Sequence, residues 1–338
     1  MTALKRAGIG IGIGGLAAVA IYGMDSIDPY RVYQLSTVFY IAIAAAGLTV
    51  LTGLNGQLSL GHGALMAIGA YTTALLLRRY TDLNPALVMA AAVVSTSLVS
   101  IVVGIAAARL RGPYLAGATL GLAVGLPGVA VRFSGVFGGD AGLSVPSIVP
   151  PDTFSTLPTE VWFAWIGLIP VVITYVLLAN LVSTRYGRDF RAIREDEVAA
   201  ELHGIRIART QVTAFVLSGA CAGLAGCLMA YTANLAAPAG FPLTLSLEVL
   251  AAIVIGGIGR LPGAVWGALI IVLAPDLMSS LNDSLHLPGG VRAQLPLALF
   301  GAVLIVAMLG FPHGIQGALD RLWRLRAMAR RRSNEAAA

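Results

Sequence analysis

The sequence has very few charged residues. Only 11% of its 338 residues are Asp, Glu, Lys or Arg, whereas 57% are hydrophobic and the mean hydropathy is +0.84. A soluble domain usually carries about a quarter charged residues, so this chain cannot cover its surface with charge. Much of that surface must therefore face lipid, and the composition predicts an integral membrane protein.

Lysine is nearly missing, because Lys5 is the only one in the chain. A nucleotide-binding P-loop needs a lysine that reaches the terminal phosphates, so this chain cannot be its own ATPase. The metalloprotease pattern H-E-x-x-H and the nucleophile pattern G-x-S-x-G are also absent from the sequence. The four histidines have no metal-ligand spacing. We therefore expect no enzyme activity and no resident metal or cofactor.

Cysteine is scarce as well, with Cys221 and Cys227 in one apolar run. On a helix they would lie about 9 Å apart along the axis and point in different directions, so we expect packing rather than a disulfide. The same run holds Gly219, Gly223 and Gly226, a spacing that lets helix backbones approach closely. This pattern predicts a tight helix bundle and says nothing about a substrate.

Long apolar stretches recur along the whole chain, and most have the roughly 17–25 residues that cross a bilayer. They lie at about 8–23, 32–54, 58–77, 86–108, 114–131, 161–182, 212–232, 243–258, 262–280 and 294–311. The sequence therefore predicts an all-α, polytopic membrane helix bundle with about ten transmembrane helices. Two pairs of stretches are joined by short glycine-rich connections, so the count varies by one or two.

The basic residues are distributed unevenly over the connections. If the N-terminus lies inside, 17 of the 22 Lys and Arg residues fall on inside segments, which is the bias that orients helices during insertion. We therefore expect both termini in the cytoplasm. The net charge of +6 then faces the inner leaflet, and no nucleic acid is expected as a partner. Residues 1–20 also resemble a cleavable signal peptide; an uncleaved first helix is the alternative, and either leaves the other spans unchanged.

Three segments interrupt or follow the apolar stretches. Residues 1–311 form the expected transmembrane domain, which includes an outside loop at 133–160 and a charged inside loop at 183–211. Residues 312–338 form a basic cytoplasmic tail, which we expect to be disordered.

Two glycine-rich connections echo each other. Gly53-Leu54-Asn55-Gly56-Gln57-Leu58 corresponds to Gly256-Gly257-Ile258-Gly259-Arg260-Leu261, and each opens a new apolar run on the inside. Weak repeats in two halves of a chain are typical of transporters, where glycine-interrupted helices often lie near the pathway. The echo predicts a two-fold internal repeat; a chance match in a glycine-rich chain is the alternative.

A few polar residues in the apolar runs are candidates for the translocation pathway. His62, between two glycines, is either a pathway residue or an interhelical hydrogen-bonding group. Glu248 is a functional candidate because ionisable groups are rare in membranes, or else a solvated carboxylate near the outer end. One such acid is too few for an ion relay, so coupling to an ion gradient is disfavoured. The pathway candidates are Asn55, Gln57, Ser59, His62 and Glu248.

The inside loop 183–211 has a helical pattern. Asp189 is a plausible N-cap and Gly204 a plausible C-terminal stop, whereas Asp196 would cap a second short helix if the segment breaks there. Ala199 and Ala200 leave a low surface where a partner could come close. A solvated amphipathic linker is the alternative interpretation.

Taken together, these residues resemble the branched-chain amino acid ABC transporter permeases. The resemblance rests on the inside loop, on Gly53 to Gly63, on Gly138 to Ser144, on Ala214 to Gly226, and on Glu248 with Gly256 to Gly259. It implies that the inside loop is the coupling segment that docks in a cleft of a separate ATPase. The candidate coupling residues are Gly187, Arg188, Asp189, Arg191, Ala192, Ile193, Arg194, Glu195, Asp196, Glu197, Ala199, Ala200 and Gly204.

The loop departs from the wider importer pattern of Glu-Ala-Ala, three residues and Gly. Val198 takes the acidic position and Glu197 stands one residue early, so the resemblance supports the role of the loop rather than a role for Glu197.

The resemblance also implies an assembly and a location. Two ABC ATPase subunits, a second homologous permease and a periplasmic or lipid-anchored binding protein would act together in a bacterial inner membrane. The substrate would be leucine, isoleucine, valine or a similar amino acid. A urea or amide importer permease is the nearest alternative. A passive channel and an intramembrane enzyme are more distant alternatives, since a channel needs no charged inside loop and an enzyme needs convergent ionisable residues.

Overall fold

The computed structural model describes residues 28–110, 113–150, 158–284, 301, 314–318 and 321. The expected spans at 8–23 and 294–311, the signal-peptide alternative and most of the basic tail 312–338 lie outside these residues. The remaining eight apolar stretches all lie within them.

Each of these eight stretches forms a helix close to its expected bounds. The helices are α2 (Pro29–Leu48) with its π-helical extension η1 (Thr49–Leu54), α3 (His62–Arg79), α4 (Pro85–Ala107), α5 (Pro113–Arg132), α7 (Thr159–Ser183), α10 (Ile207–Ala233), α11 (Leu243–Gly256) and α12 (Leu261–Ser284). Six helical segments of the described chain are long and apolar enough to cross a membrane. This confirms an all-α, polytopic membrane protein.

Local signals in the sequence set several helix starts. Asp28 and Asn84 precede Pro29 and Pro85, and their side chains accept hydrogen bonds of 3.1 and 2.9 Å from the backbone two residues further on. A capping side chain followed by proline is a strong start signal, because proline has no N–H to leave unsatisfied.

The shorter elements form two groups. One consists of α6 (Ser134–Phe137), η2 (Gly139–Ala141), β1 (Leu143–Ser144), β2 (Leu235–Ala236) and η4 (Pro238–Gly240), and the other of α8 (Arg185–Glu195) and α9 (Glu197–Leu202). The strands β1 and β2 pair antiparallel, with Leu143 opposite Ala236. This two-residue ladder ties the expected outside loop to the connection between α10 and α11.

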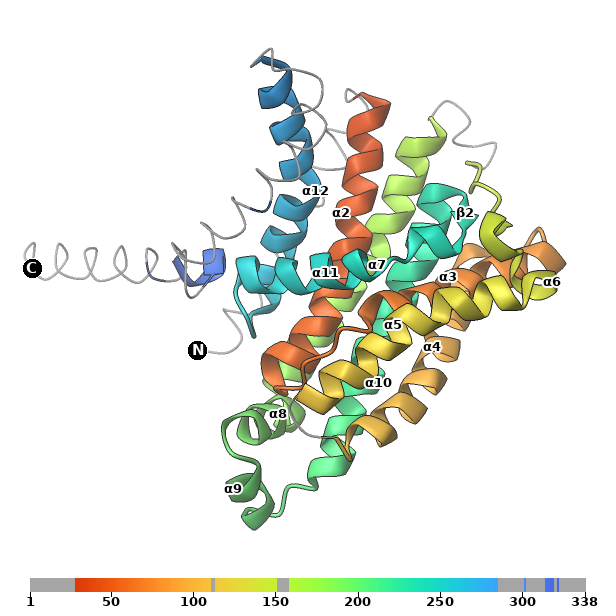
Figure 1. Ribbon diagram of the computed structural model, residues 1–338. Coiled ribbons are helices and arrows are strands. Elements are labelled where there is room, and N and C mark those ends of the chain that lie inside the picture. Colours follow the sequence, from red (N-terminus) through yellow and green to blue (C-terminus); the bar gives the residue numbers. More distant parts are fainter. Residues whose placement is uncertain are drawn as a thin grey trace, which may run out of the picture.

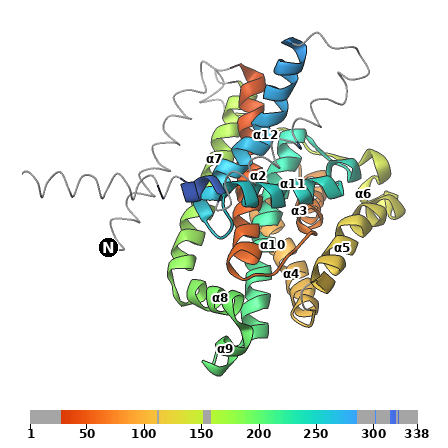
Figure 2. The same ribbon diagram turned by 60° about the vertical axis from the view of Figure 1, so that its left-hand side comes forward.

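Helix α10 packs mainly against α2, α3 and α4. Helices α2, α7 and α12 run side by side, and α11 lies across them in both views (Figures 1 and 2). Helices α8 and α9 lie at the lower end of Figure 1, whereas α2 begins and α12 ends at the upper end. The inside loop is therefore a separate two-helix element at one end of the bundle.

Glycines let α10 approach its neighbours closely. A Cβ atom at Gly223 would lie 2.5 Å from Thr96 Oγ1 and 2.7 Å from the Ala92 carbonyl oxygen on α4. On its other side, Gly223 faces Gly69 of α3. The expected close approach of helix backbones at these glycines is confirmed.

Candidate functional site

Helix α8 is held against the bundle by one apolar face. Phe190 and Ile193, three residues apart, are 0% and 3% exposed, as the i, i+3 spacing of a helix face requires. Gly187 is buried where its backbone meets Val182 at the end of α7. These contacts begin α8 at Arg185, directly after the extended Thr184.

The prediction that Asp189 is the N-cap of this segment is wrong. The helix begins four residues earlier, and Asp189 lies inside it, 3.8 Å from the Arg185 guanidinium. The physical reason is the anchoring of Gly187 and Phe190, which draws the preceding turn into the helix. An exposed i, i+4 ion pair of this kind contributes little to stability.

The second helix of the loop, α9, begins directly after Asp196, the position that the sequence offered as an alternative helix start. Asp196 is its N-cap, since Asp196 Oδ1 accepts hydrogen bonds from the backbone of Val198 (2.8 Å) and Ala199 (3.0 Å). Gly204 ends it with φ of +82°. The backbone N–H groups of Gly204 and Ile205 donate to carbonyls of the last turn, the pattern of a Schellman motif. The stop at Gly204 and the alternative of a second helix are both confirmed.

We expect Asp196→Ala to loosen α9 without unfolding the protein. The substitution removes both capping hydrogen bonds, a loss of about 1 kcal/mol. Hydrogen exchange of the amides at 197–203 should become faster, whereas Asp196→Asn should keep the protection because asparagine also caps. Equal protection in the alanine variant would show that packing alone holds α9.

The exposed face of α9 differs from the expected one. Ala200 is 3% exposed and faces the protein, so it offers no surface to a partner, whereas Val198 and Leu202 are 69% and 84% exposed. These two apolar side chains lie four residues apart, on one face of the helix. We call them the α9 apolar face. Sequence analysis missed it, although the i, i+4 spacing after the Asp196 cap is a signal that could have identified it.

The other coupling candidates differ in whether their side chains contact the bundle or are exposed. Glu197 accepts a hydrogen bond of 3.1 Å from Gln211 of α10, so it holds α9 to the bundle. Exposed polar side chains of α8 are Arg188, Arg191, Arg194 and Glu195. Arg194 differs from the other three because its guanidinium also donates a hydrogen bond to the Gly53 carbonyl of η1. Ala192 and Ala199 are half-buried.

The pathway candidates of the first break are all buried. Asn55 Nδ2 donates to Gln57 Oε1 at 2.9 Å, and Thr52 Oγ1 donates to the Gln57 carbonyl at 2.9 Å. Ser59 is also buried, and its hydroxyl accepts a long hydrogen bond from the Gly61 backbone (3.4 Å). These residues hold the break in a fixed shape and do not face an open passage in this conformation.

His62 begins α3 and is completely buried. The backbone of Ala44 interacts with its ring, but neither ring nitrogen makes a hydrogen bond within the described chain. A buried imidazole without such bonds is costly. The interhelical hydrogen bond expected as the alternative is not made within the described chain, and the pathway role of His62 stays a prediction.

Helix α11 packs directly on the start of α3. The Gly63 backbone donates a hydrogen bond of 2.9 Å to Ser246 Oγ. Glu248, on the same part of α11, is half-buried, and α11 also packs against α2. The structure therefore brings Glu248 near the helices of the first break. Sequence analysis had placed it apart from them.

The two glycine-rich connections lie against each other. A Cβ atom at Gly53 would lie 2.6 Å from the Gly259 nitrogen. Gly56 and Gly259, which occupy equivalent positions in the echo, have φ of +78° and +80°. We call this contact the inner junction; it consists of residues 53–57 and 256–260. Segments about 200 residues apart in the sequence thus lie against each other, each with a glycine at positive φ in the equivalent position.

Sequence analysis also missed an acid within an apolar run. Asp276 of α12 accepts hydrogen bonds from the Tyr30 hydroxyl (3.1 Å) and from the Gln34 amide of α2. The run 262–280 contains this residue, so its carboxylate was visible as a signal. The contacts give it a packing role between α2 and α12.

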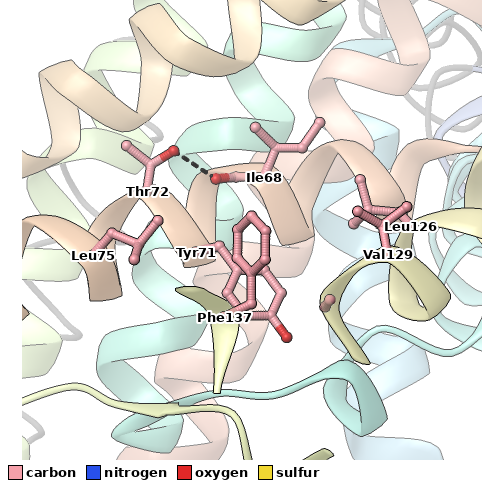
Figure 3. Close-up of a pocket in the computed structure, with 8 residues that line it drawn as sticks. Ile68, Tyr71, Thr72, Leu75, Leu126, Val129 and Phe137 are labelled. Carbon is pink, nitrogen blue, oxygen red and sulfur yellow. Dashed lines mark hydrogen bonds between the residues drawn. The ribbon is translucent and has the colours of Figure 1, made fainter. Parts of the chain in front are cut away.

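An apolar cavity of about 160 Å³ lies between α3, α5 and α6. Tyr71 and Phe137 form one wall, with ring centroids 5.2 Å apart (Figure 3). None of the lining side chains is charged, so the described residues of the cavity offer no ion-pair partner for the ammonium or carboxylate group of an amino acid.

Apolar spanning helices, buried glycine-rich breaks and a two-helix element at one end define a membrane transport subunit. The profile of the family described as "Branched-chain amino acid transport system / permease component" matches residues 30–308, and the chain belongs to this family. It is a permease subunit.

Curated relatives agree with this family. The chain is 32% identical over 308 residues to the "High-affinity branched-chain amino acid transport system permease protein LivM" of Escherichia coli (strain K12), a match that covers 82% of this chain and 68% of the relative. It is 26% identical over 294 residues to the corresponding protein LivH of the same organism, covering 82% and 91%. A probable LivM of Methanocaldococcus jannaschii is 25% identical over 233 residues, covering 66% and 67%. No solved structure matches the chain significantly.

Proposed function

We propose that this chain is one of two permease subunits of an ATP-driven importer in a bacterial inner membrane, and that it carries branched-chain or other hydrophobic amino acids inward. The names of its relatives support the substrate class. The observation that carries the proposal is the two-helix loop: α8 is packed on the bundle, whereas α9 presents an unpartnered apolar face (Val198 and Leu202).

In this proposal the chain itself hydrolyses nothing. A binding protein delivers the amino acid to the outer end, and two separate ATPases close on ATP at the inner end. The α9 apolar face docks on one ATPase, and the buried face of α8 carries the displacement into the bundle. A second homologous permease completes the passage, since alternating access requires helices that rock against each other.

We propose ten spans, both termini inside, and a two-fold repeat for the topology. The charge bias puts three connections inside, at 55–57, 185–195 and 257–260. They lie together at one end of the bundle, where Arg194 contacts both breaks. The matching backbone conformation of Gly56 and Gly259 supports the repeat. Attachment of an impermeant thiol reagent to a cysteine at position 202 from outside the cell would contradict this orientation.

The test is purification of the complex through a tag on this chain, followed by leucine uptake in proteoliposomes. We expect two ATPase subunits and a second permease to co-purify, with uptake that requires ATP and the binding protein. Deletion of 197–203 should remove the ATPases while the permease stays in the membrane. Deletion of 334–338, outside the family match, is the control.

The same experiment separates the alternatives. ATPases that stay bound to the chain lacking 197–203, or uptake independent of ATP, would contradict the proposed role of the loop. Competition of leucine uptake by isoleucine and valine, but not by urea, should distinguish the amino acid importer from a urea importer.

A further inference from the structure

We infer that Arg194 is the positioning residue that links α8 to both glycine-rich breaks at once, so that movement of the loop changes the inner junction as a unit. This inference rests on the proposed function, because it needs a partner that moves the loop. Arg194 is one of the thirteen coupling candidates that the family resemblance implies, and here it has a specific mechanical role.

Three contacts fix the Arg194 side chain at the inner junction. Its guanidinium donates a hydrogen bond to the Gly53 carbonyl of the first break. Its stem lies over Gly56, where a Cβ atom would be 3.2 Å from Arg194 Cγ. Its tip lies beside Gly259 of the second break, where a Cβ atom would be 3.3 Å from the Arg194 NH1 nitrogen. One side chain therefore contacts both members of the echo.

The chemistry of these contacts suits arginine. Carbonyl groups in the last turn of a helix lack intrahelical partners and carry the negative end of the helix dipole, and Gly53 lies in the last turn of η1. The guanidinium group offers five donors in a rigid plane, so it can hold this carbonyl and still lie flat between two backbones. A side chain at Gly56 or Gly259 would be strained there, since both have positive φ.

Helix α8 can transmit movement because one of its faces is anchored in the bundle. Ile193, next to Arg194, is buried in the bundle together with Phe190. Asp196, which caps α9, follows two residues after Arg194. Arg194 thus lies between the anchored part of α8 and the exposed α9. A displacement of α9 acts first on the last turn of α8, and through Arg194 on both breaks, which are held to each other at Gly53 and Gly259.

The experiment uses the complete complex in proteoliposomes, with leucine uptake and ATP hydrolysis measured on the same sample. We expect Arg194→Ala to keep its ATPases and to hydrolyse ATP, but to lose about tenfold or more of its uptake per ATP, as loss of a hydrogen bond to a charged group implies. Arg194→Lys should recover part of the coupling, since lysine restores the charge and one donor. The matched control is Arg109→Ala, which removes an exposed positive charge just after the end of α4.

A distance measurement separates positioning from simple structural damage. Spin labels at Leu58 and Ile258, both exposed on the two breaks, should report an ATP-dependent change in the wild-type complex and none in Arg194→Ala. A label at Glu195 on α8 should still respond in both. Wild-type uptake per ATP in Arg194→Ala would overturn the inference, as would loss of ATPase binding in that variant. Absence of ATPases from the wild-type complex would instead overturn the proposed function.

Discussion

Replacing Leu202 with aspartate should abolish leucine uptake while the permease remains in the membrane. Leu202 is the most exposed apolar residue of α9, at 84%, and Val198 lies beside it. A large apolar side chain that no part of the described chain covers is the kind of residue that dominates a protein interface. A carboxylate at its centre would lose its hydration on docking, so the substitution opposes docking as well as removing apolar contact area.

The expected effect is large because docking precedes every other step. Loss of one central interface residue costs about 2 kcal/mol or more, which is about 30-fold in affinity. Co-purification of the ATPases and ATP-driven uptake should both fall to background in Leu202→Asp. Leu110→Asp places the same charge at an exposed leucine of the α4–α5 connection and should retain both. Normal uptake in Leu202→Asp would show that the α9 apolar face is not the docking surface.

Replacing Gly223 with leucine should prevent the bundle from folding. Even the first carbon of a side chain would lie 2.5 Å from Thr96 Oγ1 and 2.7 Å from the Ala92 carbonyl. The Gly223 backbone is also packed closely against Gly69 of α3, so α10 cannot simply shift away from α4. Overpacking costs about 1–3 kcal/mol even where atoms can shift, and here the neighbouring atoms include backbone, which cannot move aside. Total stabilities are only about 5–15 kcal/mol.

The measurement is the amount of monodisperse protein extracted from the membrane and its thermal unfolding in detergent. Gly121→Leu is the matched control, because a Cβ atom at Gly121 of α5 meets no atom within 4 Å. Leucine has a better helix propensity than glycine, so the control should be at least as stable as the wild type. A well-folded Gly223→Leu variant would mean that α10 does not cross α3 and α4 as closely as described.

The contrast between these two glycines shows where sequence reasoning ends. Both lie in glycine-rich apolar runs with similar spacing. Gly223 lies where α10 crosses α3 and α4, whereas a Cβ atom at Gly121 would meet no atom of the described chain within 4 Å. Spacing alone predicts that some backbones approach closely, but which glycine is used depends on the neighbours that the fold supplies.

In the inside loop, too, local signals were predictable from the sequence and packing was not. Asp196 and Gly204 were identified correctly as helix signals because capping depends on a few adjacent residues. Asp189 was not, because the start of α8 depends on the burial of Phe190 and on the approach of Gly187 to α7. Ala200 faces inward and Leu202 outward for the same reason, since the bundle decides which side of α9 is covered.

By itself, the sequence determined the membrane environment and the eight long helices that the structure describes, since hydrophobicity and helix signals are local properties. Tertiary structure alone decided that two breaks about 200 residues apart meet at Gly53 and Gly259, and that Arg194 lies between them. Such contacts depend on how the helices pack over long sequence distances, which no local pattern specifies.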